Sequence, residues 1–297
     1  MIPSRVMAVQ ILCIAGPTAS GKSSRAVEEA LARGGEIISV DSRQVYRGLN
    51  IGTEKIINEE MRGVPHHLID IRDLKENYSA GDFVADATRL IKEISARGKL
   101  PILVGGTHFY FDALLSGLPM GTDVNLELRE ELEKLSTEEL YARVHSRDAR
   151  RAVELDPKNR RRLIRALEII ASLGSVPPRS KEVRPPYLVG RSDLFTTIEW
   201  IIIDPPAQEL RKRINARLAS ALERGLVEEV RRVREKVGDI RLGELGLEYK
   251  IVGEYLRGER DETSLLPALS AKLWQYARRQ KAWLRKLREE NTISAGS

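Results

Sequence analysis

A phosphate-binding loop near the amino terminus limits the folds open to this chain more than any other feature. The loop is Gly16-Pro17-Thr18-Ala19-Ser20-Gly21-Lys22-Ser23, which fits the pattern G-x-x-x-x-G-K-[ST] at every fixed position. The apolar run at 9–15 predicts a buried strand before the loop, and residues 24–33 predict a helix after it. A strand, a glycine-rich loop and a helix in this order are typical of parallel α/β sheets.

Each fixed residue of the loop suits it to hold phosphate. Gly16 and Gly21 let backbone N–H groups turn inward, and the start of the helix adds its positive dipole end. Lys22 supplies a positive charge, and the Ser23 hydroxyl can hold Mg²⁺, the cofactor that we expect. We therefore expect a di- or triphosphate ligand, and a glycine-rich turn without a ligand is the alternative. The pattern leaves open whether the phosphate is transferred, hydrolysed or released.

Two further strands are predicted to end beside this loop. An apolar strand at 36–40 is followed by Asp41, and another at 101–104 is followed by Gly105-Gly106-Thr107. Ligands bind at the carboxyl ends of the strands in open parallel sheets, so Asp41 and Thr107 should lie near the loop. Asp41 could hold Mg²⁺ through water or accept a proton, or it could only cap a helix. Thr107 could donate a hydrogen bond to a phosphate or to a nucleophile, or it could only shape a turn.

The middle of the chain predicts an inserted helical domain. No strand pattern occurs between about residue 119 and Phe195, whereas amphipathic helical patterns are frequent there. Apolar periodicity and capping signals predict the following other elements: a strand or its approach at 65–70, a helix after Ser79 that ends at Gly98, helices at 126–135, 137–147 and 159–173, a strand at 196–204, and helices at 207–224, 226–237 and 267–290. Proline pairs at 177–178 and 185–186 predict loops, and 291–297 predicts a frayed tail.

These elements predict an α/β fold class, namely a P-loop NTPase-like parallel sheet flanked by helices, with an inserted helical domain. We expect the first part of the sheet domain at 1–118, the helical domain at 119–192, and the second part with the carboxyl-terminal helices at 193–297.

Composition indicates the compartment and the charge of a partner. The net charge of +6 favours an anionic partner such as nucleic acid, although the chain is 31% charged and both signs are abundant. The single Cys13 excludes an internal disulfide and suits a reducing compartment. No apolar run approaches the roughly 20 residues of a membrane span. We expect a cytoplasmic monomer with no membrane segment.

Arginine-rich segments are the remaining candidates for binding. Arg217 projects along the edge of the apolar arc of its helix, where it needs either a structural carboxylate or a phosphate ligand. The clusters at 160–165 and 278–288 are solvated helix faces or nucleic-acid contacts, and core packing is favoured for Trp274 and Trp283. His66 and His67 fit no zinc spacing and are interpreted as structural.

Seven segments together resemble the tRNA dimethylallyltransferases, also called tRNA isopentenyltransferases, and they occur in the family's order across nearly the whole chain. The segments are the loop at 16–23, Asp41-Ser42-Arg43-Gln44-Val45-Tyr46-Arg47-Gly48 with Ile51-Gly52-Thr53, Pro65-His66-His67-Leu68-Ile69-Asp70, Val104-Gly105-Gly106-Thr107, Arg161-Arg162-Leu163-Ile164-Arg165-Ala166-Leu167-Glu168, Gly225-Leu226-Val227-Glu228-Glu229-Val230, and Tyr276-Ala277-Arg278-Arg279-Gln280.

The resemblance implies transfer of a prenyl group from dimethylallyl diphosphate to the exocyclic amine of the adenosine just 3′ of a tRNA anticodon. It implies that Asp41 is the general base, that Thr107 lies close to the reacting centre, and that Arg217, Lys22 and Mg²⁺ stabilise the departing diphosphate. By the same resemblance the helical insertion grips the anticodon stem-loop of the tRNA. The implied tRNA contacts are Asp41, Ser42, Arg43, Gln44, Arg129, Arg161, Arg162, Leu163, Ile164 and Arg165.

The sequence also departs from the family pattern. Ser23 replaces the commoner threonine, the segment 245–250 differs from the usual bacterial form, and the proline-rich segment 176–190 matches no family pattern. A phosphate-loop kinase for a small molecule is an alternative for the amino-terminal third, but it gives no reason for the arginine-rich insertion. A nucleotide-regulated RNA-binding module without chemistry is another alternative.

Overall fold

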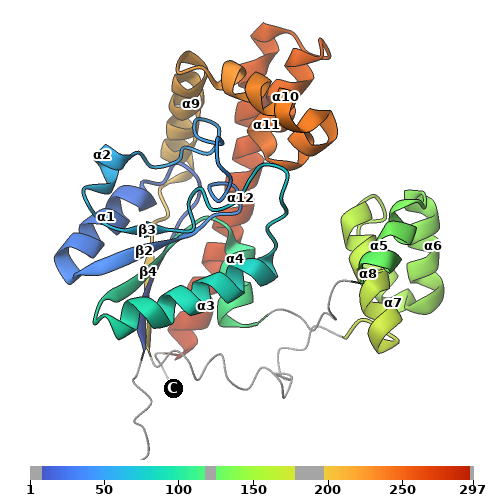
Figure 1. The fold of residues 1–297 in the computed structure, drawn as a ribbon, viewed down its shortest axis with the longest axis horizontal. Helices are drawn as coiled ribbons and strands as arrows, with labels where there is room; N and C mark the ends of the chain where they lie inside the picture. Colours follow the sequence, from blue (N-terminus) through green and yellow to red (C-terminus); the bar gives the residue numbers. More distant parts are fainter. Residues whose placement is uncertain (1–8, 118–124, 178–196, 295–297) are drawn as a thin grey trace, which may run out of the picture. The chain divides into compact units, whose positions relative to one another are not determined.

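The computed structural model describes residues 9–117, 125–177 and 197–294 (Figure 1). The chain divides into two compact units: Met1–Ser116 with Gly190–Ser297, and Gly117–Val189. We call the first the sheet unit and the second the helical unit. The expected domain boundaries at 118–119 and 192–193, the loop at 185–186 and the end of the tail at 295–297 lie outside the described residues.

The sheet unit contains a five-stranded sheet in which every neighbouring pair is parallel. Its strands are β1 (Gln10–Ala15), β2 (Gly35–Val40), β3 (His66–His67), β4 (Leu100–Gly105) and β5 (Thr197–Ile202), in the order β3-β2-β4-β1-β5. Val40 and Ala15 both pair with Gly105, so β1, β2 and β4 end side by side. Asp41 and Thr107 consequently follow strands that end beside the phosphate loop.

Helices cover the sheet and continue beyond it (Figure 1). They are α1 (Lys22–Arg33), α2 (Asn58–Met61), α3 (Ala80–Ala96), α4 (His108–Leu115), α9 (Ala207–Glu223), α10 (Leu226–Glu244), α11 (Leu247–Leu256) and α12 (Glu262–Ser294). Ser79 begins α3 with the predicted capping box, since its hydroxyl accepts the Asp82 N–H and Asp82 accepts its N–H. The sequence did not predict α2, α4 and α11, and α12 runs through 291–294, where we expected a frayed tail.

The strands β1, β2 and β4 are largely apolar because they are buried on both faces of the sheet, whereas β3 and β5 at its edges are partly exposed. Leu12, Ile14 and Ile102 are fully buried, and they pack with Ala26 and Val27 of α1. Cys13 is also fully buried, which raises the pKa of its thiol and fits the predicted role in core packing. The expected α/β fold class, with a parallel sheet flanked by helices and an inserted helical domain, is confirmed.

The helical unit contains α5 (Leu126–Glu133), α6 (Thr137–Arg147), α7 (Ala149–Glu154) and α8 (Arg160–Leu173). Each helix begins after a residue whose side chain accepts a backbone N–H: Asn125, Ser136, Asp148 and Asn159. Leucine, isoleucine and valine side chains from these helices form a separate core. Four capped helices around their own core explain why this stretch has no strand pattern.

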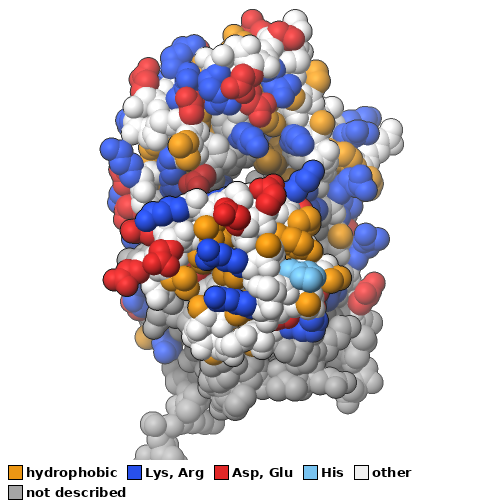
Figure 2. All heavy atoms as spheres, turned by 90° about the vertical axis from the view of Figure 1, so that its right-hand side faces the viewer, with side chains coloured by type: hydrophobic (Ala, Val, Ile, Leu, Met, Phe, Trp, Pro, Cys, Tyr) orange, Lys and Arg blue, Asp and Glu red, His pale blue; other side chains and the backbone are white. Residues whose placement is uncertain are grey.

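Charged side chains of both signs occur on one face of the molecule (Figure 2). On the face drawn in Figure 2, Lys and Arg side chains lie among Asp and Glu and do not form a single patch. In the part of the chain that the structure describes, no helix is both long enough and apolar enough to cross a membrane.

Candidate active site

The phosphate loop has the backbone conformation that its glycines allow. A Cβ on Gly16 would lie 2.5 Å from Ser20 Oγ and 2.8 Å from the Ile203 carbonyl oxygen, so only glycine fits there. Gly21 has a φ of 87° and Ala19 a φ of 60°, which turn the backbone of the loop back on itself. Ser20 Oγ is buried and has no hydrogen-bond partner within the described residues. An oxyanion in the loop would supply the missing partner.

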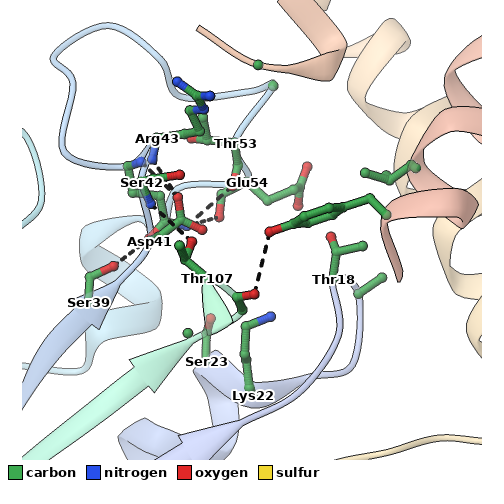
Figure 3. A pocket seen from close by; sticks show the side chains of 18 of the residues that line it. Thr18, Lys22, Ser23, Ser39, Asp41, Ser42, Arg43, Thr53, Glu54 and Thr107 are labelled. Atoms are coloured by element: carbon green, nitrogen blue, oxygen red, sulfur yellow. Dashed lines mark hydrogen bonds between the residues drawn. The ribbon is translucent and has the colours of Figure 1, made fainter. Parts of the chain in front are cut away.

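A cavity of about 420 Å³ opens over this loop. Its walls come from the phosphate loop, the ends of β2 and β4, the segment 52–54, Arg217 of α9, the start of α11, and α12. In Figure 3 the side chains of Asp41, Thr107, Lys22 and Ser23 point toward the same space, and Thr18 lies across from them. The predicted catalytic and phosphate-binding side chains therefore line one cavity.

Asp41 presents one carboxylate oxygen to the backbone and the other to the cavity. Its Oδ1 accepts the N–H groups of Arg43, at 2.8 Å, and Gln44, at 3.1 Å, which orients the carboxylate. No donor among the described residues partners Oδ2. The expected alternative, a helix N-cap, is wrong because a turn follows Asp41 and no helix. Oδ2 is thus available to accept a proton from a ligand.

Thr107 lies against the same turn. Its Oγ1 accepts the Ser42 N–H at 3.3 Å, and its side chain also forms a hydrogen bond with Tyr276. Tyr276 of α12 lies nearby, with its hydroxyl 3.5 Å from the Gly106 carbonyl oxygen. Burial and the negative charge of Asp41 raise the pKa of Tyr276 to about 12, so the phenol stays protonated.

Lys22 is held at the floor of the cavity. Its Nζ donates to the Pro17 carbonyl oxygen at 3.1 Å. Burial lowers the pKa of Lys22 to about 8, with Asp41 acting in the opposite direction and Arg217 adding to the lowering. A bound polyanion would reverse the lowering, since it favours the protonated amine.

Arg217 links the phosphate loop to the opposite wall. Its Nη1 donates to Thr18 Oγ1, and its Nη2 donates to the Gly52 carbonyl oxygen at 3.3 Å and lies 3.6 Å from Glu248 Oε1. Both predicted environments of Arg217, a phosphate site and a structural carboxylate, are therefore present. Burial raises the pKa of Glu248 against the influence of Arg217. The sequence did not single out Glu248, because its segment departs from the family pattern.

Gln280 of α12 joins the phosphate loop to the end of β4. Its Oε1 accepts the Thr18 N–H at 3.0 Å, and its Nε2 donates to the Gly106 carbonyl oxygen at 2.8 Å. A Cβ on Gly106 would lie 2.4 Å from Gln280 Nε2, which explains glycine at that position. In the sequence, Gln280 belongs to the segment 276–280 that resembles the family pattern, but no role was predicted for it. The two hydrogen bonds to Thr18 and Gly106 assign it a structural role at the cavity.

The rest of the basic stretch at 278–288 has mixed surroundings. Lys281 donates to Asp204 and to the Pro205 carbonyl oxygen, and Arg279 lines the cavity beside Tyr276. Trp274 and Trp283 are half-buried and not in the core, and Trp283 Nε1 donates to Asp112 at 2.9 Å. Parts of this stretch therefore support the fold, and Arg279 faces the cavity.

The histidine pair has hydrogen-bond partners within the protein. His66 Nδ1 lies 2.8 Å from the Val64 carbonyl oxygen, and His67 Nε2 lies 2.8 Å from Glu36. Burial lowers the pKa of His66. These contacts fit a structural role.

The residues around the loop suit Mg²⁺ only together with a phosphate ligand. Ser23 is the second residue of α1, and its exposed hydroxyl makes no hydrogen bond to the described residues. In those residues no group of three or more His, Cys, Asp or Glu side chains could hold a metal ion. Ser23 would therefore share the ion with phosphate oxygens, as in other phosphate loops.

The expected tRNA-binding residues of the helical unit differ in exposure. Arg161 and Arg162 are exposed on α8, whereas Leu163 and Ile164 are 0% and 3% exposed in the core of the unit. The side chains of Leu163 and Ile164 therefore pack in the core of the helical unit, and a tRNA contact at these two positions stays a prediction. The reason is that five consecutive helical residues go round more than a full turn and include positions that face the core.

Arg129 and Arg165 share one buried carboxylate in the helical unit. Arg129 donates to Glu168 at 2.7 and 3.1 Å, and Arg165 donates to it at 2.9 Å. The two arginine side chains are 41% and 37% exposed, against 2% for Glu168. Glu168 thus holds two arginines together while each keeps part of its guanidinium at the surface.

Comparisons with known proteins agree with this geometry. Residues 44–287 match the family described as IPP transferase. The chain is 40% identical to a tRNA dimethylallyltransferase of Thermomicrobium roseum, over 94% of this chain and 84% of that protein. It is 39% identical to a tRNA dimethylallyltransferase of Streptococcus gordonii, over 94% of this chain and 90% of that protein.

Solved structures lead to the same family. The crystal structure of a tRNA isopentenylpyrophosphate transferase from Bacillus halodurans aligns with a TM-score of 0.67 at 37% identity, covering 93% of this chain and 87% of that one. A eukaryotic dimethylallyltransferase acting on tRNA aligns with a TM-score of 0.76 at 27% identity, covering 93% and 70%. From the matched range, the identities and the shared fold, we conclude that this chain belongs to the IPP transferase family.

Proposed function

We propose that this protein transfers a dimethylallyl group from dimethylallyl diphosphate to the N6 amine of the adenosine 3′-adjacent to the anticodon in tRNA, releasing diphosphate. The observation that carries the proposal is the common cavity, in which Asp41 and Thr107 face a phosphate loop, in a chain 40% identical to a tRNA dimethylallyltransferase. The reaction needs a proton acceptor beside a diphosphate site, and the position of Asp41 beside the phosphate loop supports this proposal.

The proposed reaction forms a bond from N6 of adenosine to C1 of the prenyl group and breaks the bond from C1 to the diphosphate oxygen. Asp41 Oδ2 accepts the proton that N6 loses, and Thr107 orients the amine through its hydroxyl. Lys22, Arg217 and the loop N–H groups stabilise the charge that develops on the departing diphosphate. Mg²⁺ held with Ser23 would add to this charge stabilisation.

The proposed binding of tRNA is supported by exposed basic residues, and it requires that the target base can enter the cavity. The cavity lies among side chains of the sheet unit, so the target base must leave its stack to enter it. Ser42, Arg43 and Gln44 lie at the wall of the cavity, where they could contact that base. Arg161 and Arg162 lie exposed on α8, where they could bind RNA phosphates. We further propose that the protein acts as a cytoplasmic monomer.

Mass analysis of RNA after reaction tests the proposal. An unmodified anticodon stem-loop with an adenosine-rich loop is incubated with the protein, Mg²⁺ and either dimethylallyl diphosphate or ATP. We expect a gain of one prenyl group on one loop adenosine, only with the prenyl donor. No gain with a panel of tRNAs, together with consumption of ATP and a small acceptor, would instead establish a phosphate-loop kinase.

Replacing both Arg161 and Arg162 with Ala is expected to weaken RNA binding and to flatten its salt dependence. Each lost phosphate contact on single-stranded RNA should reduce the log–log slope by roughly 0.7. The measurement is RNA affinity at several salt concentrations, with Lys92→Ala as the control, because Lys92 is an exposed residue of α3. An unchanged slope in the double variant would exclude these arginines from the RNA contact.

A further inference from the structure

A buried carboxylate outside the proposed machinery, Glu229 of α10, is held by four hydrogen bonds. It accepts the backbone N–H groups of Asn50 at 3.0 Å, Ile51 at 2.8 Å and Gly52 at 3.0 Å, and the Tyr249 hydroxyl at 2.7 Å. Glu229 is only 3% exposed, and within the described residues no Lys or Arg forms an ion pair with it. A buried carboxylate without a cation is costly unless donors surround it, and here the segment 50–52 supplies three of the four.

The segment that Glu229 holds also fixes the guanidinium over the phosphate loop. The N–H of Gly52 points to Glu229, while its carbonyl oxygen accepts Arg217 Nη2 at 3.3 Å. The other end of the same guanidinium donates to Thr18 of the phosphate loop. A displacement of the Gly52 peptide would therefore move or release Arg217.

Close packing against Tyr249 also restricts the position of Gly52. A Cβ on Gly52 would lie 2.9 Å from the ring of Tyr249, so the backbone at Gly52 rests directly on this ring. The Tyr249 hydroxyl in turn donates to Glu229. Gly52 is thus held by a hydrogen bond from one side and by an aromatic ring from another, with little freedom to shift.

We propose that Glu229 is a positioning residue for the transfer reaction: it fixes the segment 50–52 so that the Gly52 carbonyl holds Arg217 at the diphosphate site. The inference rests on the proposed function only in that Arg217 binds the diphosphate. The proposal also gives Glu229 a role within Gly225-Leu226-Val227-Glu228-Glu229-Val230, a segment that resembles the family pattern and had no assigned role.

The test is the Glu229→Gln variant, with Glu228→Gln as the matched control. Glutamine has nearly the same shape but replaces one acceptor oxygen with an NH₂ group, which would face donors. Glu228 is the next residue and its side chain is 57% exposed. Affinity for inorganic diphosphate with Mg²⁺ is measured by calorimetry, alongside the KM for dimethylallyl diphosphate and the affinity for RNA.

We expect Glu229→Gln to weaken diphosphate binding by about tenfold and to raise the KM for dimethylallyl diphosphate by a similar factor. Effects of this size are common for residues that share one hydrogen-bond network. RNA affinity and the Glu228→Gln control should stay unchanged. In an Arg217→Ala background the further effect of Glu229→Gln on diphosphate should disappear, because the guanidinium that it positions is gone. Equal weakening with and without Arg217, or no weakening in a folded protein, would overturn the proposal.

A second variant covers the case in which Glu229→Gln does not fold. Tyr249→Phe removes one of the four hydrogen bonds and leaves the three backbone donors in place. It should weaken diphosphate binding by about threefold in the native background and not at all with Arg217→Ala. The absence of any effect would overturn the proposal. Because inorganic diphosphate is the probe, this result is independent of whether prenyl transfer to RNA occurs.

Discussion

Replacing Asp41 with Asn is expected to lower the rate of prenyl transfer by about 10²–10⁴-fold while leaving the affinities for RNA and dimethylallyl diphosphate nearly unchanged. The amide oxygen of Asn can still accept the N–H groups of Arg43 and Gln44, so the turn is retained. The amide lacks a basic oxygen to take the proton from N6. Single-turnover transfer and equilibrium binding, measured on the same preparation, separate the two effects.

Two further variants support the assignment of Asp41. Asp41→Ala removes the proton acceptor and the turn contacts together, and should lower the rate of transfer at least as much as Asp41→Asn does. Asp73→Asn is the matched control, because Asp73 is exposed and its Oδ1 accepts the Lys75 N–H in a similar turn. Transfer at near native rates by Asp41→Asn would assign the proton to another acceptor. Loss of all modification at unchanged RNA affinity would exclude a binding module without chemistry.

Replacing Lys22 with Ala is expected to weaken the binding of dimethylallyl diphosphate and to lower turnover as well. The ammonium group lies at the floor of the cavity, where low exposure makes a charge-assisted hydrogen bond to an anion strong. Calorimetric titration with the diphosphate ester measures the loss, with Lys99→Ala, an exposed lysine, as the control. Native diphosphate affinity together with lost transfer would reverse the roles of Lys22 and Asp41.

The pH dependence of binding provides an independent check on Lys22. Because burial lowers its pKa to about 8, the free protein loses this positive charge as the pH rises through 8. The diphosphate binds the protonated form, so its affinity should fall above pH 8 by up to about tenfold per pH unit. The Lys22→Ala variant should lack this fall. A parallel pH profile in both proteins would assign the titration to the ligand or to another group.

Local sequence patterns predicted the part of the site that comes from adjacent residues. The phosphate loop lies between a strand and a helix, and Asp41 and Thr107 each follow a buried strand, so parallel pairing was enough to bring them together. The helices α4 and α11 escaped prediction for local reasons. Most residues of α4 are apolar, which hides its periodicity, and α11 begins after Gly246 without a side-chain cap.

The hydrogen bonds of Glu229 and Gln280, which hold the segments around the cavity, could not be predicted from local sequence patterns. The backbone donors to Glu229 lie 177 to 179 residues away in the chain, and the Thr18 amide lies 262 residues from Gln280. A glutamate or glutamine within an amphipathic helix has the same local pattern whether it faces solvent or a distant backbone. The fold of the whole sheet unit decides whether such a side chain faces solvent or a distant backbone. A short window of sequence does not contain this information.

The bond from Thr18 to Gln280 has a consequence for the order of synthesis. The phosphate loop and the ends of β2 and β4 leave the ribosome early, and α12 follows the rest of the sheet unit. Until α12 docks, the Thr18 amide and the Gly106 carbonyl lack the side chain that joins them. A nascent chain thus carries its phosphate loop before it has α12, the helix whose Gln280 joins that loop to the end of β4.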